Sequence, residues 1–234
     1  MAKTRVGIRN GALVPPSSGI ITDGLVLNLD ASNTLSYPGT GTDWFDLTSN
    51  NNDGVLLNGA SYVTDGGGSI SFDGVNDYVR IPKITNNVYS LNIWYKMGIN
   101  DGTYGYLGGN DSNKGFAISE GGSYGGLSYG EFYYYDSKQP HSLGFISSTT
   151  EWVNVSTIID TTLNNIKVYC NGVLISNNTV NLLSTDITLI GVYYSGAYYN
   201  YLNGKIGSYN IYNRTLTDSE VLQNYNATKD RFGL

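Results

Sequence analysis

The chain has 234 residues, a formal net charge of −6 and only 14% charged residues, with 30 glycines and 21 tyrosines. A helical protein of this length would carry more Lys, Glu and Ala, so this composition favours an all-β fold rich in turns. A chain of this size buries roughly 70% of its unfolded surface, which is enough for one large β domain with its own core.

Residues 1–22 differ from the rest of the chain in charge. They hold three basic residues and no acidic one, whereas the remainder holds 10 basic and 19 acidic side chains, a net charge of −9. The acidic body disfavours nucleic acid as a partner. Residues 15–19, PPSSG, predict an extended connector without helix. We therefore expect an N-terminal arm before a domain at residues 23–234.

This arm is either a disordered tail or a segment that docks onto a neighbouring subunit or particle, since apolar anchors are not needed in a solvated tail. The side chains expected to attach it are Lys3, Arg5, Val6, Ile8, Arg9, Leu13 and Val14.

Neither a secretory signal nor a membrane span is visible. Apolar residues near the N-terminus are scattered among Arg, Asn and Pro, and no apolar run approaches the roughly 20 residues that cross a bilayer. The single cysteine, Cys170, allows no intrachain disulfide and is expected to be a small buried residue on a strand. We expect synthesis in a cytoplasm, without membrane insertion.

Strand signals begin at residues 25–29, LVLNL. Residues 69–72 and 78–81 are also predicted as strands, and the intervening DGVND indicates either a β-hairpin or a sharp sheet corner. Residues 89–96, YSLNIWYK, show the period of two expected when one face of a strand is buried. The side chains assigned to that face are Tyr89, Leu91, Ile93 and Tyr95.

Further strands are predicted at residues 152–159 and 166–175, the second folding back at Asn171-Gly172, a dipeptide suited to a type I′ turn. One helix start stands out near the C-terminus. Thr217 and Glu220 have the spacing of a capping box, and Leu216 and Val221 that of a hydrophobic staple. We expect a helix of about ten residues lying against the sheet edge.

These segments resemble the concanavalin A-like lectin/glucanase superfamily, in particular the laminin-G-like jelly-roll domain of bacteriophage structural proteins. The matching stretches are GLVLNLDASNTLSYPGTGTDWFDLTSNNNDGVLLNG, SISFDGVNDYVRI, YSLNIWYK, NGVLI and LNGKIGSYNIYNRTLTDSEVLQNYNATKDRFGL. The resemblance implies a concanavalin A-like sandwich of two curved antiparallel sheets, with no single function attached to it.

Catalysis is not expected. Glucanase members of the superfamily carry a Glu-x-Asp-x-x-Glu strand motif, which this sequence lacks, and its four glutamates are too far apart to share one strand face. Glu220 is already explained by capping. The only histidine, His141, follows a proline in a loop-like stretch and is expected to be structural or incidental.

A calcium site is a weaker possibility. Asp73, Asn76 and Asp77 place three oxygen ligands within five residues, and related jelly rolls sometimes hold calcium near their loops. Asx side chains also form such turns by bonding their own backbone, which is the simpler explanation. No other cofactor is expected.

Tyrosines gather in two regions rich in Gly, Ser and Asn, a composition that favours recognition because tyrosine offers a rigid, half-polar surface. Three explanations stay open: ordinary strand usage, subunit contacts and glycan binding. The residues selected as candidates for binding are Tyr104, Tyr106, Tyr124, Tyr129, Tyr193, Tyr194, Tyr198, Tyr199 and Tyr201; residues 133–135 belong to the first region.

The resemblance and the arm together predict a non-enzymatic phage virion structural protein, such as a capsid decoration, head fibre or tail appendage component. Its expected partners are other virion proteins, further copies of itself and a host-surface glycan. The alternatives are a lectin-like adhesin module and, less favoured, a glycoside hydrolase.

Overall fold

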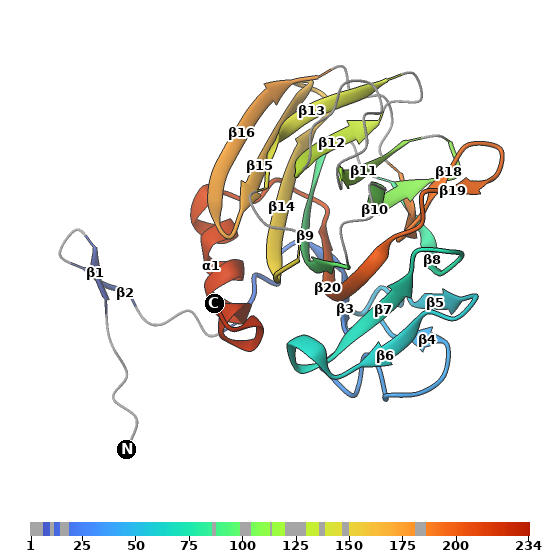
Figure 1. Ribbon diagram of the computed structural model, residues 1–234. Helices are drawn as coiled ribbons and strands as arrows, with labels where there is room; N and C mark the ends of the chain where they lie inside the picture. Colours follow the sequence, from blue (N-terminus) through green and yellow to red (C-terminus); the bar gives the residue numbers. More distant parts are fainter. Residues whose placement is uncertain are drawn as a thin grey trace.

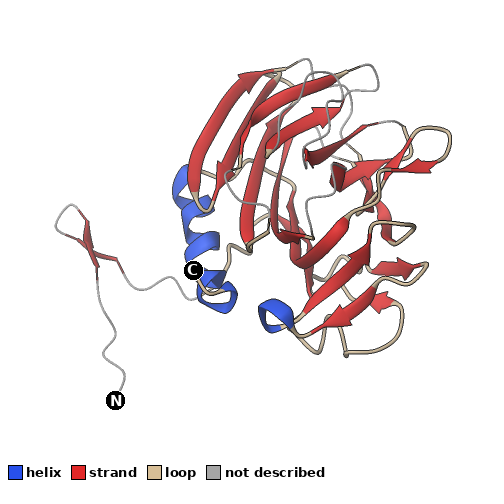
Figure 2. Cartoon of the chain, viewed as in Figure 1, coloured by secondary structure: helices blue, strands red, loops and turns tan. Residues whose placement is uncertain are grey.

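The computed structural model describes residues 7–9, 12–14, 19–85, 88–98, 104–112, 114–119, 130–135, 139–146, 150–180 and 186–234, with the backbone alone for residues 7–9, 12–14, 88, 104, 118 and 119. Strands make up nearly all of the regular structure (Figure 2). Two large antiparallel sheets pack face to face, as the all-β jelly-roll prediction requires (Figure 1).

Sheet 1 has the strand order β13-β12-β11-β10-β17-β8-β5-β4. Its strands are β4 (Asp43–Trp44), β5 (Gly54–Leu57), β8 (Tyr78–Ile84), β10 (Tyr104–Asn110), β11 (Lys114–Ser119), β12 (Glu131–Tyr135), β13 (Pro140–Phe145) and β17 (Ile187–Ile190). His141 therefore lies in strand β13, stacked on Tyr134 with ring centroids 6.4 Å apart, and not in a loop as expected.

Sheet 2 has the order β16-β15-β14-β9-β20-β7-β6. On the side of β20 away from β9, residues 203–206 pair with β7 and residues 208–212 pair with β3. Its strands are β3 (Leu25–Asp30), β6 (Ser61–Val63), β7 (Ser69–Asp73), β9 (Val88–Met97), β14 (Val153–Asp160), β15 (Asn165–Cys170), β16 (Val173–Thr179) and β20 (Asn203–Tyr212).

The core lies between the inner faces of the two sheets. Leu91 and Ile93 of β9 pack in one cluster with Val79 of β8 and with Phe132 and Tyr134 of β12. Side chains of a strand alternate between the two faces of a sheet, so the predicted face of residues 89–95 points into this core.

The opposite face of β9 is also buried, which the period of two did not predict. Ser90 and Trp94 are fully buried and Asn92 is 1% exposed, because helix α1 (Asp218–Thr228) and the 3₁₀ helix η2 (Lys229–Phe232) cover this face. Trp94 stacks on Phe232 with ring centroids 4.1 Å apart. The helix thus lies across the face of sheet 2, and the expectation that it lies against the sheet edge was wrong.

The turn after β7 is a sheet corner and not a hairpin, since β7 belongs to sheet 2 and β8 to sheet 1. The predicted turn at Asn171-Gly172 does join a hairpin, β15 to β16, with φ of 50° and 76° as a type I′ turn requires. The predicted capping box is present too: Thr217 Oγ1 accepts from Glu220 N, and Glu220 Oε2 accepts from Thr217 N.

Two short hairpins stand outside the large sheets. Strands β1 (Gly7–Arg9) and β2 (Ala12–Val14) pair with each other and, within the described backbone, with no strand of either sheet. Strands β18 (Tyr193–Tyr194) and β19 (Tyr198–Tyr199) form the second hairpin. A further 3₁₀ turn, η1 (Asp65–Gly67), precedes β7. None of the helices in the described segments is long and apolar enough to cross a bilayer.

Candidate binding site

A pocket lined by tyrosines lies between the β18–β19 hairpin and the outer face of sheet 1. Its volume is about 320 Å³. Phe132 and Tyr134 of β12 point into the core, so strand alternation turns Tyr133 and Tyr135 outward. The described residues that line the pocket are Tyr106, Tyr133, Tyr135, Tyr193, Ser195, Tyr199 and Asn200.

The rings hold one another in fixed orientations. Tyr193 of the hairpin stacks on Tyr106 of β10 with centroids 4.7 Å apart, and it meets Tyr135 edge-on at 5.4 Å. Tyr106 also meets Tyr133 edge-on at 6.1 Å. Ala117 of β11 pairs with both Tyr106 and Tyr133, and this small residue leaves room for the two rings to approach each other across the strand.

The pocket combines a buried base with an accessible rim. Tyr106 and Tyr133 are each 2% exposed, whereas Tyr135 is half-buried and Tyr199 is 51% exposed. Burial, assisted by the neighbouring Tyr133, raises the pKa of Tyr106 well above its ordinary value. The Tyr106 phenol therefore stays protonated in neutral solution. Accessible aromatic rings beside phenol, hydroxyl and amide groups suit a ligand with both apolar and hydroxylated faces.

The far side of the hairpin is anchored to sheet 1. Tyr198 stacks on Tyr78 of β8 at 4.9 Å, and Arg80 Nη2 donates to the Tyr198 hydroxyl at 2.6 Å. Arg80 also pairs with Asp111, its Nη1 lying 3.1 Å from the carboxylate. These contacts fix the hairpin and with it one wall of the pocket.

The structure thus separates the predicted tyrosines into two groups. Tyr106, Tyr193 and Tyr199 line the pocket, while Tyr194, Tyr198 and Tyr201 pack with Tyr78 on the other side of the hairpin. Of Tyr104 only the backbone is described, and Tyr124 and Tyr129 lie outside the described residues.

Sequence reasoning did not select Ser195 or Asn200. Asn200 has a φ of 52°, a conformation that Asn tolerates better than most residues, so its position after a Tyr-Tyr pair was a weak signal for a tight turn. Tyr133 and Tyr135 could have been chosen over Tyr134 only by knowing which face of β12 is inward.

The candidate calcium residues form the corner between the two sheets. Asp77 Oδ2 accepts from Asp73 N, and Asp73 Oδ1 accepts from Val75 N and Asn76 N. Turn chemistry thus engages both carboxylates, although Asp77 Oδ1 is buried without a hydrogen-bond partner. Among the described residues, no three His, Cys, Asp or Glu side chains cluster as metal ligands would. The calcium site stays a prediction.

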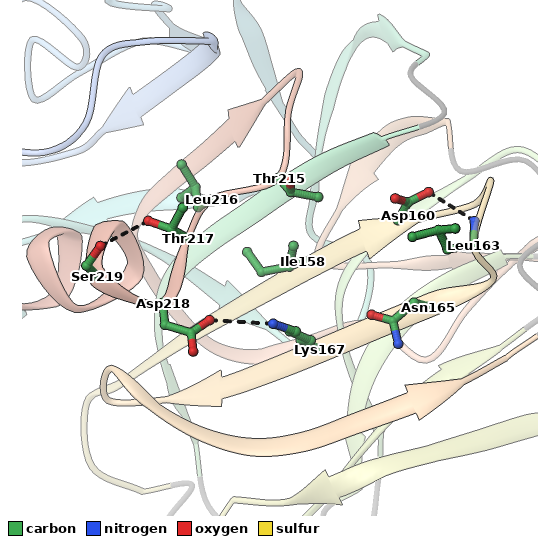
Figure 3. A pocket seen from close by; sticks show the side chains of 10 residues that line it. All are labelled: Ile158, Asp160, Leu163, Asn165, Lys167, Thr215, Leu216, Thr217, Asp218 and Ser219. Carbon is green, nitrogen blue, oxygen red and sulfur yellow. Dashed lines mark hydrogen bonds and ion pairs between the residues drawn. The ribbon is translucent and has the colours of Figure 1, made fainter.

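A second concave surface lies on the outer face of sheet 2, where β14 turns into β15 (Figure 3). We call it the β14–β15 groove. It has a volume of about 670 Å³, and no aromatic ring is among its described lining residues. One wall consists of Ile158, Asp160, Leu163, Asn165 and Lys167, and the other of residues 215–219. None of these was predicted as a binding residue.

The predicted arm is described in part. Ile8 pairs with Leu13, and Arg9 and Val14 also lie in the β1–β2 hairpin, with Gly7 opposite Val14 and Ala12 opposite Arg9. Lys3, Arg5 and Val6 lie outside the described residues. Residues 19–22 belong to the domain, since Ile21 packs against the cluster that contains Ile158 and Leu216.

The two face-to-face antiparallel sheets and the aromatic pocket on one of them define a jelly-roll domain with a surface suited to ligand binding. The family model Laminin_G_3, described as concanavalin A-like lectin/glucanases superfamily, matches residues 72–222. The chain belongs to this superfamily.

Solved structures share the fold. Domain 4 of AbnA, a GH43 extracellular arabinanase from Geobacillus stearothermophilus, in complex with arabinotriose, is 20% identical with a TM-score of 0.65; the match covers 86% of this chain and 98% of that one. The binding domain of botulinum neurotoxin DC in complex with SialylT is 13% identical with a TM-score of 0.65, covering 89% and 52%.

The Trypanosoma rangeli sialidase in complex with the inhibitor DANA is 18% identical with a TM-score of 0.63, covering 94% of this chain and 35% of the sialidase. The chain therefore spans about half of the toxin domain and about a third of the sialidase. No curated protein sequence matches it.

Proposed function

We propose that this protein is a non-enzymatic binding module that holds a saccharide in the tyrosine pocket. The observation that carries the proposal is the pairing of a rigid buried ring cluster with the accessible rings of Tyr135 and Tyr199 in a pocket of about 320 Å³. The hydrophobic faces of a sugar ring stack on such side chains, while its hydroxyls bond to phenol and amide groups.

Two similarities support this proposal. The AbnA domain was solved with arabinotriose and the toxin binding domain with SialylT, and both share the sandwich with this chain. A glycosidase would instead need two carboxylates roughly 5 to 10 Å apart in an open cleft. Glu220 is not available for such a pair, because it caps α1 and lies 2.7 Å from Arg214 Nη2.

The test is a glycan array followed by calorimetric titration of the strongest hit. Tyr199→Ala should weaken binding about 3- to 10-fold, the value of one aromatic contact. Phe45→Ala is the matched control, because Phe45 is an exposed aromatic residue (40%) away from the pocket. It follows β4, the edge strand of sheet 1 at the end far from β12. Silence across the array, or equal losses in both variants, would overturn the proposal.

The second candidate is the phage virion structural protein that the sequence suggested, attached to the particle through its arm. The observation that favours it is the β1–β2 hairpin, which pairs with no described strand of the two large sheets and belongs to a segment, residues 1–18, with three basic residues and no acidic one. The test is a deletion of residues 1–18, which removes the arm but keeps Ile21, because Ile21 packs against the domain. The shortened protein is expected to fold but not to join particles, and its incorporation at the normal level would contradict this role.

A further inference from the structure

The β14–β15 groove has the chemistry of a polypeptide-binding surface. Leu163 is 71% exposed at the β14–β15 turn, and the buried apolar side chains of Ile158 and Leu216 also line the groove. Without an aromatic ring among the described lining residues, the groove offers no surface for a sugar to stack on. Apolar side chains of a peptide fit it better.

The groove also carries negative charge. Asp160 accepts from Thr162 Oγ1 at 2.6 Å, and Asp218 accepts from Tyr169 at 2.6 Å and lies 3.5 Å from Lys167 Nζ. The hydrogen bond from Thr162 lowers the pKa of Asp160, and that from Tyr169 lowers the pKa of Asp218. Both carboxylates are therefore ionised in neutral solution. Figure 3 shows them in the groove with Lys167, the one lysine among its described lining residues.

The N-terminal arm complements this surface. Residues 1–18 contain Lys3, Arg5 and Arg9 and no acidic residue, while the rest of the chain has a net charge of −9. They also supply four apolar side chains. The apolar residues are Val6, Ile8, Leu13 and Val14.

The arm leaves the domain beside the groove. Ile21 N donates to Asn224 Oδ1 at 2.7 Å, and Ile21 O accepts from the Tyr212 hydroxyl at 3.0 Å. The side chain of Ile21 packs in the same cluster as Ile158 and Leu216, which line the groove. In a two-fold pair of chains, each arm would therefore start close to the groove of its own copy and could cross to that of its neighbour.

We propose that the β14–β15 groove binds the N-terminal arm of a second copy of this chain, so that two copies exchange arms. Exchange is favoured over self-docking because the β1–β2 hairpin pairs with no described strand of its own sandwich, and because the PPSSG sequence favours an extended connector over one folded back onto its own domain. The exchange is independent of the tyrosine pocket.

The test measures the mass of the full chain by light scattering and sedimentation over a range of concentrations. Wild type should form dimers that dissociate on dilution and at high salt. Leu163→Lys should weaken dimerisation at least 10-fold by removing the apolar contact and repelling the arm. Leu35→Lys is the control, because Leu35 is 77% exposed in the loop after β3 and adds the same charge away from the groove; it should leave dimerisation unchanged.

Charge reversal in the N-terminal arm provides a second, independent test. Arg5→Glu with Arg9→Glu should also weaken dimerisation, and combining these changes with Leu163→Lys should restore part of the loss. A wild-type protein that is monomeric at every concentration would overturn the exchange, because an arm bound in the groove of its own chain would give that result. So would equal losses in Leu163→Lys and Leu35→Lys, with both variants shown to be folded by circular dichroism.

Discussion

Asp65 is the acidic centre of an ion-pair cluster on sheet 2. Its Oδ2 lies 2.6 Å from Lys205 Nζ and 3.5 Å from Lys96 Nζ, and its Oδ1 accepts from Trp152 Nε1. The hydrogen bond from Lys205 is the main cause that lowers the pKa of Asp65 to about 2. Because the folded carboxyl is the stronger acid, its stabilising contribution is complete above about pH 4 and is lost as the pH falls toward about 2.

Asp65→Asn should therefore lower the free energy of unfolding at pH 7 by about 1 to 2 kcal/mol, since the partly exposed carboxylate is screened by solvent. Urea titrations of both proteins should converge near the lower end of that pH window. Asp111→Asn, which breaks the more exposed pair with Arg80, should cost less than about 1 kcal/mol. A deficit in Asp65→Asn that persists undiminished in acid would contradict the ion-pair explanation.

Asp77 tests the calcium prediction at the same scale. Desolvation raises the pKa of its buried carboxyl. In a metal-free protein the ionised carboxylate therefore destabilises the fold at pH values above the pKa of the folded state. This destabilisation decreases as the pH falls through that pKa and the group takes up a proton. Asp77→Asn should then raise the free energy of unfolding at pH 7 by up to about 1 kcal/mol, measured by urea titration in excess chelator. A wild-type melting temperature that rises with calcium, and fails to rise in Asp77→Asn, would instead establish the metal site.

At the scale of elements, the start of α1 depends on Thr217. Its hydroxyl accepts from Glu220 N at 3.3 Å, and Glu220 Oε2 accepts from Thr217 N at 2.8 Å. The Glu220 carboxylate also forms an ion pair with Arg214. Thr217→Ala should lower the free energy of unfolding by about 1 kcal/mol, and Thr217→Ser by less than about 0.5 kcal/mol. Thermal melts followed by circular dichroism would measure both, and equal effects of the two substitutions would argue against capping.

Elements specified by neighbouring residues were predictable from the sequence. The capping box and the Asn171-Gly172 turn depend on contacts within a few positions, so their residues alone indicate the geometry. The turn after Asp73 did not reveal whether β7 and β8 share a sheet, because Asp and Gly suit a hairpin and a corner equally. That choice depends on pairing with β20 and β17, which lie more than 100 residues away.

At the scale of the whole molecule, the pocket required information that no local pattern contains. Tyr106, Tyr135 and Tyr199 come from three separate strands and meet only because the β18–β19 hairpin lies over sheet 1. Composition indicated a tyrosine-rich surface, but not which ring faces the core and which faces the pocket. The same holds for β9, whose polar-looking face is buried by a helix more than 120 residues further along the chain.

The C-terminal segment completes the layered structure, and Phe232 is its anchor. The ring is 7% exposed and lies 4.1 Å from Trp94 and 4.8 Å from Trp152, measured between centroids. It fits because Gly207 of β20 leaves space beneath it, where a Cβ would lie 2.7 Å from the ring. Phe232→Ala should lower the free energy of unfolding by about 3 kcal/mol, the usual result of deleting a buried aromatic ring.

The matched control for this prediction is Leu234→Ala, two residues later and 46% exposed, which should change stability by less than about 0.5 kcal/mol. Urea unfolding followed by tryptophan fluorescence reports both quantities, because Trp94 and Trp152 lose their packing when the segment detaches. If Phe232→Ala were as stable as Leu234→Ala, the two-sided burial of β9 would not depend on this segment, and the sandwich alone would account for the stability of the domain.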